Sequence, residues 1–441
     1  MKMNGRFRSH HDTQAAVSKA LENKQGKSGG PPNRTLPRES SSTEMKAAMA
    51  NSLQFTDLLA MIPEDHPRGL YLHLPYCDRI CSFCNMRREQ STGENLHAYA
   101  RHLNTVFSSI SHTPYVRSRP FDVLYFGGGT PSVLSNHDTS QLYPLIRKSL
   151  ELAPGHEWTV ESTLHNLTDE KLRIFSDCGV NRLSIGIQSF TDNGRKMLGR
   201  SGDGAWARRK FETIRGRFDG TVAIDLIYSW PGQSQEHLER DIQYIRELDI
   251  DSISFYSLMI HPGSTLSNDI DSGRLLFEKT DEYDRQMHNR FYESMLAQGY
   301  ELLELTKIVK PGRDSYRYID IRYQNCDLLP LGNGAGGRVM GHRVYHMDAE
   351  RTMISPPKQE ADRYNLLIGL LQFGNYHAEK IASILSGLSF EFIENILSEY
   401  ESAGLLSRSD DDGARRLSPD GVFWGNNLAV DLIERVIEAQ D

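Results

Sequence analysis

The sequence predicts an α/β protein organised around a parallel β-sheet, and three observations support this fold class. Between residues 70 and 260, short runs rich in β-branched and aromatic residues alternate with amphipathic helical windows. Such alternation requires crossover connections, which join parallel strands. The chain has 441 residues, 38% of them hydrophobic and 24% charged, which is ordinary for a globular protein of about two or three domains. No window has the ~20 apolar residues that a membrane-spanning helix needs.

Six strands and five intervening helices make up this alternating region. The strands are expected at 70–74, 123–126, 158–162, 182–187, 222–228 and 252–257. The helices are expected near 95–112, 138–152, 168–177, 205–217 and 234–248. Six such strands fit either a doubly wound sheet or a barrel that stops short of eight strands, and periodicity alone does not choose between them.

The first 50 residues form a separate polar zone. They hold nine Lys or Arg and four Asp or Glu, and Gly, Pro and Ser runs interrupt any periodicity. Such a segment cannot bury enough apolar surface to offset the entropy of ordering, so we expect residues 1–50 to be a disordered extension. A basic docking arm is the functional alternative.

After residue 260 the pattern changes. A helix is expected near 280–297, with strands near 302–306, 327–331 and 343–346, so residues 51–350 are assigned to a core with an irregular extension. Residues 351–441 are assigned to a small C-terminal cap. Its helical windows at 358–372, 377–385 and 389–404 precede a hairpin, as in a winged-helix unit. The cap lacks a basic recognition face, which favours a packing or lid role over DNA binding.

Charge and cysteine content exclude several classes of protein. The chain has 50 Lys or Arg against 58 Asp or Glu, a formal charge of −8, which gives no sign of a nucleic-acid partner. Five cysteines in a long chain do not indicate a disulfide framework. No apolar block follows the basic N-terminal residues, so no secretory signal is expected. Together these features predict a cytoplasmic protein with no membrane partner.

Three of the cysteines, Cys77, Cys81 and Cys84, form a C-x3-C-x2-C run directly after the first predicted strand. Three thiolates on one tight loop can bind three irons of a cuboidal iron–sulfur cluster, because thiolate is the soft ligand that such iron prefers. A structural zinc site and a ferredoxin cluster use four protein ligands, and the next cysteine is Cys178. One iron would therefore stay open to a non-protein ligand. Zinc and three unrelated thiols are the alternatives.

Two further features follow predicted strands. Gly127, Gly128 and Gly129 come after the second strand and precede Thr130. Consecutive glycines let a backbone approach a ligand closely and can hold a zwitterion, although such a run can also be a simple turn. Glu161 ends the third strand, where its carboxylate would sit at the mouth of a barrel; a solvated surface acid is the alternative.

The cysteine run is similar to the signature of the radical S-adenosylmethionine (SAM) enzymes. Residues 71–77, 184–190 and 225–233 resemble motifs of the oxygen-independent coproporphyrinogen oxidase branch, and the likeness spans residues 70–437. The resemblance implies a partial (βα)6 TIM-like barrel and a [4Fe-4S] cluster held by the three cysteines, with SAM bound to the open iron. In this family, an electron from the reduced cluster cleaves SAM to methionine and a 5′-deoxyadenosyl radical.

The resemblance also implies two SAM molecules, one as radical source and one as carbon donor. Residues that match Tyr71, Gly128 and Glu161 hold the first SAM in the family. The second is surrounded by residues that match Phe83, Gly129, Thr130, Gln188, Arg200 and Asp225. The alternative for Asp225 and Arg200 is an ion pair across the barrel mouth. The chain departs from the family pattern at residues 162–163 and 229–230.

Three branches of the family compete. Coproporphyrinogen oxidases carry a further Cys directly after the triplet, where this chain has Asn85 and Met86. Haem chaperones bind haem without a demonstrated catalytic role. Residues 327–342 and 417–427 most resemble the third branch, the haem-degrading radical SAM methyltransferases or anaerobilin synthases.

This third branch implies an enzyme that methylates and opens haem without oxygen and releases its iron. It also implies a reduced flavodoxin or ferredoxin-type protein as electron donor. The alternatives are a coproporphyrinogen III oxidase-like enzyme, a radical SAM methyltransferase of another porphyrin-like or unrelated substrate, and a non-catalytic haem chaperone.

Two other patterns carry weaker signals. His261 and His342 could bind a substrate's iron, but a lone histidine is more often a surface or core residue. Residues 332–337 fit G-x-G-x-x-G, yet the residues after them resemble a strand and not the helix that a dinucleotide fold requires. We expect instead a close approach of this backbone to a flat or adenine-bearing ligand.

Overall fold

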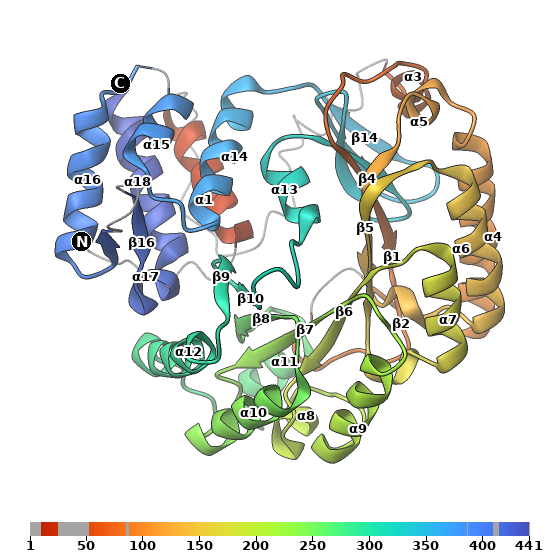
Figure 1. The fold of residues 1–441 in the computed structure, drawn as a ribbon, viewed down its shortest axis with the longest axis horizontal. Helices are drawn as coiled ribbons and strands as arrows, with labels where there is room; N and C mark the ends of the chain where they lie inside the picture. The colour runs from red at the N-terminus through yellow and green to blue at the C-terminus, as the bar shows by residue number, and fades with distance from the viewer. Residues whose placement is uncertain (1–9, 25–52, 85–87, 386, 409–413, 441) are drawn as a thin grey trace.

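The computed structural model describes residues 10–24, 53–84, 88–385, 387–408 and 414–440, and its centre is a 12-stranded sheet (Figure 1). The six predicted strands are confirmed and lie in chain order, all parallel. They are β1 (Arg68–Leu74), β4 (Phe121–Gly128), β5 (Leu152–Ser162), β6 (Arg182–Gln188), β7 (Thr221–Tyr228) and β8 (Ser252–Ser257). A further parallel strand, β11 (Asp327–Leu331), pairs with β1. Within the described ranges no pairing joins β8 to β11, so the barrel is partial.

The five predicted helices are also confirmed, and they cover the outer side of the sheet (Figure 1). They are α4 (Gly93–Ile110), α6 (Asn136–Ser149), α7 (Asp169–Cys178), α9 (Gly204–Arg215) and α10 (Gln235–Leu248). Each begins after a Ser, Thr or Asp whose side chain accepts a backbone N–H bond from the first turn. The pattern did not predict α8 (Asp192–Met197), α11 (Thr265–Asp271) or α13 (Arg317–Tyr323), each of which has only six or seven residues.

Side chains alternate along the strands between an apolar outer face and a polar inner face. On β6, Leu183 and Ile185 are fully buried beneath the helices, whereas Arg182 and Ser184 take the opposite positions of the pleat. A doubly wound sheet is apolar on both faces because helices cover both. The polar inner face therefore favours the barrel, and it places chemically active side chains in the barrel's interior.

Antiparallel strands extend the sheet at both ends. The predicted helix and strands after residue 260 are confirmed as α12 (Asp281–Leu296), β9 (Glu301–Glu304), β11 and β13 (His342–His346). Three further strands were not predicted: β10 (Lys307–Val309), β12 (Gly336–Val339) and β14 (Thr352–Ser355). Since β14 pairs with β13, the sheet runs slightly past residue 350. In the part of the chain that the structure describes, no helix is long and apolar enough to cross a membrane.

The C-terminal region has its own hydrophobic core, beside the barrel in Figure 1. The three predicted helical windows correspond to α14 (Gln359–Gln372), α15 (Ala378–Ile384) and α16 (Phe390–Ser402). The hairpin of β15 (Leu406–Arg408) and β16 (Arg415–Leu417) follows. Two more helices, α17 (Pro419–Phe423) and α18 (Gly425–Ala439), complete the region, and the pattern did not single them out.

The expectation of disorder over residues 1–50 is wrong for residues 10–24, which form helix α1 (His10–Lys24). Val17 is 3% exposed and belongs to the C-terminal core. Thr13 donates a hydrogen bond to Asn426 Oδ1 at 2.9 Å. Thr13 and Val17 lie four residues apart and share a helix face, a short signal that the polar average composition conceals. The other residues of the 1–50 segment lie outside the described ranges.

A buried ion pair fixes the connection between β10 and α13 to the barrel. Arg182 on β6 donates from Nε and Nη2 to Asp314 at 2.9 and 2.8 Å, and both side chains are 1% exposed. Asp314 also accepts hydrogen bonds from Ser252 and from the backbone of Tyr316. Burial acts to raise the pKa of Asp314, but Arg182 outweighs this effect and holds it below the usual range. The start of α13 is therefore tied to β6 and β8.

We predict that Asp314→Asn lowers the free energy of unfolding by about 3–5 kcal/mol, because it leaves the Arg182 charge buried without a counter-charge. Urea unfolding measures this loss. As a control, Asp169→Asn removes an ion pair with Arg217 in which both side chains are 53% exposed, and it should cost about 1 kcal/mol or less. Equal losses for the two variants would contradict the role assigned to the buried pair.

Candidate functional site

The three cysteines of the C-x3-C-x2-C run lie on one loop beside a cavity of about 740 Å³ that opens to solvent. Cys77 belongs to the two-residue strand β2 (Tyr76–Cys77), which pairs with β3 (Glu89–Gln90). None of the three thiols forms a disulfide with another described cysteine, and all three line the cavity. In the described ranges, no three His, Cys, Asp or Glu side chains are gathered tightly enough to hold a single metal ion. The donors nevertheless have the chemistry of a three-thiolate site for an iron–sulfur cluster.

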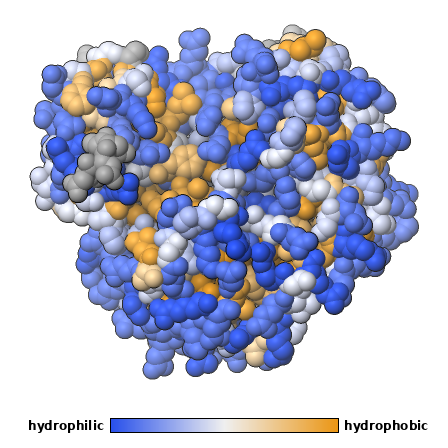
Figure 2. Space-filling model, in the orientation of Figure 1, coloured by the Kyte–Doolittle hydropathy of each residue, from blue (hydrophilic) through white to orange (hydrophobic). Residues whose placement is uncertain are grey.

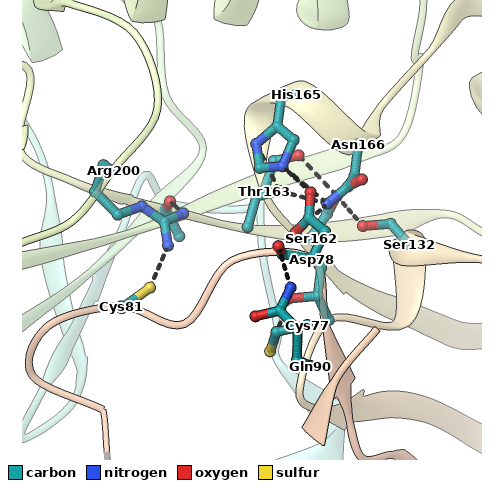
Figure 3. Close-up of polar contacts among 12 residues, drawn as sticks. Cys77, Asp78, Cys81, Gln90, Ser132, Ser162, Thr163, His165, Asn166 and Arg200 are labelled. Carbon is teal, nitrogen blue, oxygen red and sulfur yellow. Dashed lines mark hydrogen bonds and ion pairs between the residues drawn. The ribbon is translucent and has the colours of Figure 1, made fainter. Parts of the chain in front are cut away.

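Hydrogen bonds connect two of these thiols to the barrel. Arg200 donates from Nη1 to Cys81 Sγ at 3.0 Å, and Thr130 donates from Oγ1 to Cys77 Sγ at 3.5 Å. Figure 3 shows the Arg200 contact with Cys81. Burial raises the pKa of the Cys77 thiol, and the Thr130 hydrogen bond opposes this effect. Donors aimed at sulfur stabilise the thiolate, which is the form that binds metal.

Asp78, directly after Cys77, anchors the same loop to the end of β5. Its carboxylate contacts His165 and accepts a bond from Asn166 Nδ2 at 3.4 Å (Figure 3). The amide of Gln90 donates to the Asp78 carbonyl at 2.6 Å. Local sequence patterns could not predict this contact, because Asp78 and His165 are 87 positions apart. The cysteine loop is thus held on both sides of the cavity.

The glycine run brings the end of β4 against the segment that leads into the cysteine loop. The backbone N–H of Gly129 donates to Leu74 O at 2.7 Å. A Cβ on Gly129 would lie 2.5 Å from Tyr76 O, and Gly128 has a φ of +109°. Only glycine allows both features without strain. The run is therefore more than a simple turn, and Gly128, Gly129 and Thr130 all line the cavity.

Glu161 points into the barrel and lines the cavity, so the alternative of a surface acid is wrong. Tyr125 donates a hydrogen bond to Glu161 Oε1 at 2.6 Å. Burial raises the pKa of Glu161 to about 7; the Tyr125 hydrogen bond lowers it, and the charge of Asp225 raises it further. A cationic ligand beside Glu161 would reverse this balance and favour the carboxylate.

Gln188, Arg200 and Asp225 line the same cavity at the ends of neighbouring elements. Gln188 lies at a bulge in the β6–β7 pairing with a φ of +70°, and its buried Oε1 has no hydrogen-bond partner in the described ranges. Bulges of this kind commonly aim a side chain at a site. The alternative ion pair between Arg200 and Asp225 is not formed, because Arg200 instead contacts Cys81 and the Gly186 carbonyl.

Two of the predicted site residues do not line the cavity. Tyr71 stacks on Tyr125, with 6.2 Å between ring centroids, and its hydroxyl lies 2.9 Å from His73 Nδ1. Phe83 packs against a small apolar cluster that includes Trp230. Neither ring lines the cavity, because Tyr71 packs against Tyr125 and Phe83 packs in its own apolar cluster.

The cavity also contains residues that the motifs did not single out. They are Arg79, Arg88, Ser162, Thr163, Ser184 and Gly186. The arginines lie on or near the cysteine loop, and Arg88 donates to the Cys84 carbonyl. The carboxylates Glu161 and Asp225 lie on inward positions of β5 and β7. The cavity is therefore cationic beside the cysteines and anionic on the opposite wall. The positions of Arg79 and Arg88 close to the cysteine run in the sequence could have predicted the cationic side of the cavity.

The weaker sequence signals lie elsewhere. His261 and His342 do not line the cavity, and His342 Nδ1 lies 3.0 Å from the Met340 carbonyl. Residues 332–337 lead into strand β12, which confirms that they are not a dinucleotide-binding turn. The backbone at Gly332 approaches His73 of β1. The close approach at this turn is thus to the protein's own strand, and Asn85 and Met86 lie outside the described residues.

A parallel partial barrel with three cysteines after its first strand defines a radical SAM protein, and the chain belongs to the radical SAM superfamily. The model of that superfamily matches residues 71–267. The family implies a [4Fe-4S] cluster and SAM. Three cysteines outside any disulfide and the Gln188 oxygen that lacks a hydrogen-bond partner in the described ranges lie at one cavity and fit these groups.

Within the superfamily, the chain lies in the coproporphyrinogen oxidase-like branch. It is 29% identical over 385 residues to anaerobilin synthase of Escherichia coli O157:H7, which covers 84% of each chain. It is 30% identical to heme chaperone HemW of Lactococcus lactis subsp. lactis, over 64% of this chain and 72% of the relative. Coproporphyrinogen III oxidase (HemN) from Escherichia coli has the same fold, with a TM-score of 0.70 and 18% identity over 88% and 93% of the two chains.

We predict that stability at the cavity depends on pH through Glu161. A carboxyl whose pKa is raised on folding stabilises the fold below its usual value near 4.5, and this contribution is lost as the pH rises through about 7. Between pH 5 and 8, the free energy of unfolding of the wild type should fall by about 2 kcal/mol relative to Glu161→Gln.

Urea unfolding at the two pH values gives this difference, and the buried Asp241, whose pKa is also raised to about 7, cancels because both proteins retain it. Identical pH dependence of the wild type and Glu161→Gln would show that Glu161 does not titrate in this range.

Proposed function

We propose that this chain is a radical SAM methyltransferase that methylates and opens haem without oxygen and releases the iron. One observation carries the proposal: the cysteines share a single cavity with Gln188, Arg200 and Asp225. These last residues match the set that holds a carbon-donating SAM in the resembling family. The likeness to anaerobilin synthase over most of both chains supports the same activity.

Different residues around the cavity have different proposed roles. When bound, the cluster and two SAM molecules would supply an electron, a 5′-deoxyadenosyl radical and a transferable carbon. Cys77, Cys81 and Cys84 would hold the cluster, and Arg200 donates a hydrogen bond to Cys81 Sγ. Glu161 and Asp225 offer negative charge to the cationic sulfonium and amino groups of SAM. Gly128 and Gly129 bring the backbone close enough to orient such a ligand.

A porphyrin-like substrate is favoured because the relatives include anaerobilin synthase, heme chaperones and an oxygen-independent coproporphyrinogen III oxidase. Haem is the substrate that we propose. A reduced flavodoxin or ferredoxin-type protein would deliver the electron, and the cytoplasm is the reducing compartment in which free thiols and a reduced cluster persist.

A non-catalytic haem chaperone is the second candidate. The 30% identity to HemW favours it, and the same cavity residues could bind ligands without turnover. The two candidates make different predictions: an enzyme forms 5′-deoxyadenosine and consumes haem, whereas a chaperone binds haem and leaves its spectrum intact.

We predict that the anaerobically reconstituted, reduced protein supplied with SAM and haem forms 5′-deoxyadenosine while the haem absorption band decreases. Chromatography measures the nucleoside, and spectroscopy follows the band. Stable haem binding without 5′-deoxyadenosine would support the chaperone, and absence of both changes would contradict the enzyme.

Cysteine variants provide the controls for this reaction. Cys81→Ala should lack the brown cluster chromophore, contain less iron and form no 5′-deoxyadenosine. Cys178→Ala, in α7 and away from the cavity, should keep all three properties. A cluster of unchanged spectrum and iron content in Cys81→Ala would contradict the ligand assignment.

A further inference from the structure

Helix α13 lies between the barrel strands and the C-terminal helices (Figure 1). Its residues Tyr318 and Arg322 are four positions apart and therefore share one face. The ring of Tyr318 stacks on Tyr125 with 4.0 Å between centroids, and Tyr125 bonds Glu161 of the site cavity. Tyr318, on the same helix face as Arg322, is therefore linked to Glu161 of the cavity wall through a single residue, Tyr125.

Both ends of α13 are held in place. Glu157 at the base of β5 accepts a bond from the backbone N–H of Arg317 at 2.8 Å. At the other end, Asn365 of α14 donates from Nδ2 to the Arg322 carbonyl at 3.0 Å. Gln14 of α1 donates in turn to Asn365 Oδ1 at 3.0 Å. The backbone of Arg322 is therefore held in place by α14, and α1 holds Asn365 of α14 in turn.

Arg322 is an exposed residue, and no ion pair within 4 Å joins its guanidinium to a carboxylate of the described ranges. Burial raises the pKa of the nearby Glu304 carboxyl, and the charge of Arg322 acts against this effect. It lies 5.8 Å from the centre of the Tyr318 ring. The pKa of Arg322 lies above its usual value, first because of Tyr318 and against the effect of burial. The neighbouring acid, Glu304, is buried and accepts a bond from Thr306 at 2.6 Å. A fixed cation without a carboxylate partner is ready to pair with an anionic ligand.

Aromatic rings lie beside Arg322, and Tyr318 next to it is 8% exposed. Tyr71 and Tyr318 stack with 6.2 Å between their centroids. Tyr256, on an inward position of β8, is 36% exposed. On the viewed face, Figure 2 shows apolar residues at the surface between the C-terminal helices and the barrel, within a mostly hydrophilic surround. Aromatic rings beside one cation match a planar macrocycle that carries carboxylate groups.

We propose that Arg322, presented by α13, binds a carboxylate substituent of the substrate. This inference rests on the proposed function and specifies its substrate class as a tetrapyrrole with free carboxylates. The bidentate geometry of a guanidinium fits a carboxylate, and the position of α13 would orient the ring system toward Glu161 and the cysteines.

Equilibrium titration of the reconstituted protein, without reductant, tests this subsite with two ligands: haem and the dimethyl ester of haem. The ester has the same ring but no anionic groups. The wild type should bind haem about tenfold more tightly than the ester, as expected for one charge-assisted hydrogen-bonded pair. Arg322→Gln should weaken haem binding by about tenfold and leave ester binding unchanged, whereas Arg322→Lys should recover part of the loss.

Arg101→Gln, on the exposed outer face of α4, is the matched control and should bind both ligands as the wild type does. Unchanged haem binding by Arg322→Gln, or an equal loss for haem and ester, would overturn the carboxylate subsite alone. Absence of binding of both ligands to the wild type would overturn the proposed substrate class as well.

Discussion

The arrangement of the site depends on one buried interaction, the ion pair between Arg182 and Asp314 inside the barrel. Asp314 precedes α13, and its bonds to β6 and β8 fix where that helix begins. Through α13, the pair sets the position of Tyr318, which stacks on Tyr125, which in turn bonds Glu161. A charge pair buried at this depth is tolerated because the two charges neutralise each other, and such a pair specifies position more than it adds stability. The position of Glu161 on the anionic wall of the cavity is thus linked to the buried ion pair through these contacts.

The opposite wall is built from the cysteine loop. Arg200 and Thr130 donate to its sulfurs, and Asp78 attaches it to the end of β5. Cations therefore lie where thiolates and an anionic cluster would need them, and carboxylates lie where a sulfonium ligand would. The two walls therefore attract opposite ends of a zwitterionic ligand and orient it. Burial raises the pKa of Glu161, and the charge of Asp225 adds to this effect, so keeping the anionic wall charged has a cost in free energy.

Local sequence patterns were enough to predict the six parallel strands, their helices and the three cysteines, whereas Gln188, Arg200 and Asp225 were predicted by the resemblance to the radical SAM family. These features are encoded by period-2 and period-3.6 patterns and by short motifs at strand ends. The pattern could not reveal the Arg182–Asp314 pair, whose partners are 132 residues apart, or the contact of Asp78 with His165. The pattern did not predict α1, because the apolar face around Val17 is short and lies within a polar segment. It could not show that Tyr71 and Phe83 pack behind the wall, since a motif specifies residue identity and not the direction of a side chain.

The central claim is that Gln188, Arg200 and Asp225 surround a SAM molecule that gives its methyl carbon to the substrate. Mass spectrometry of the tetrapyrrole product, after turnover with SAM labelled in its methyl group, tests this claim most directly. We expect the ring-opened product to carry the labelled carbon, and Asp225→Asn to reduce its incorporation more than it reduces cluster content. An opened tetrapyrrole that contains no labelled carbon would contradict the methyltransferase assignment.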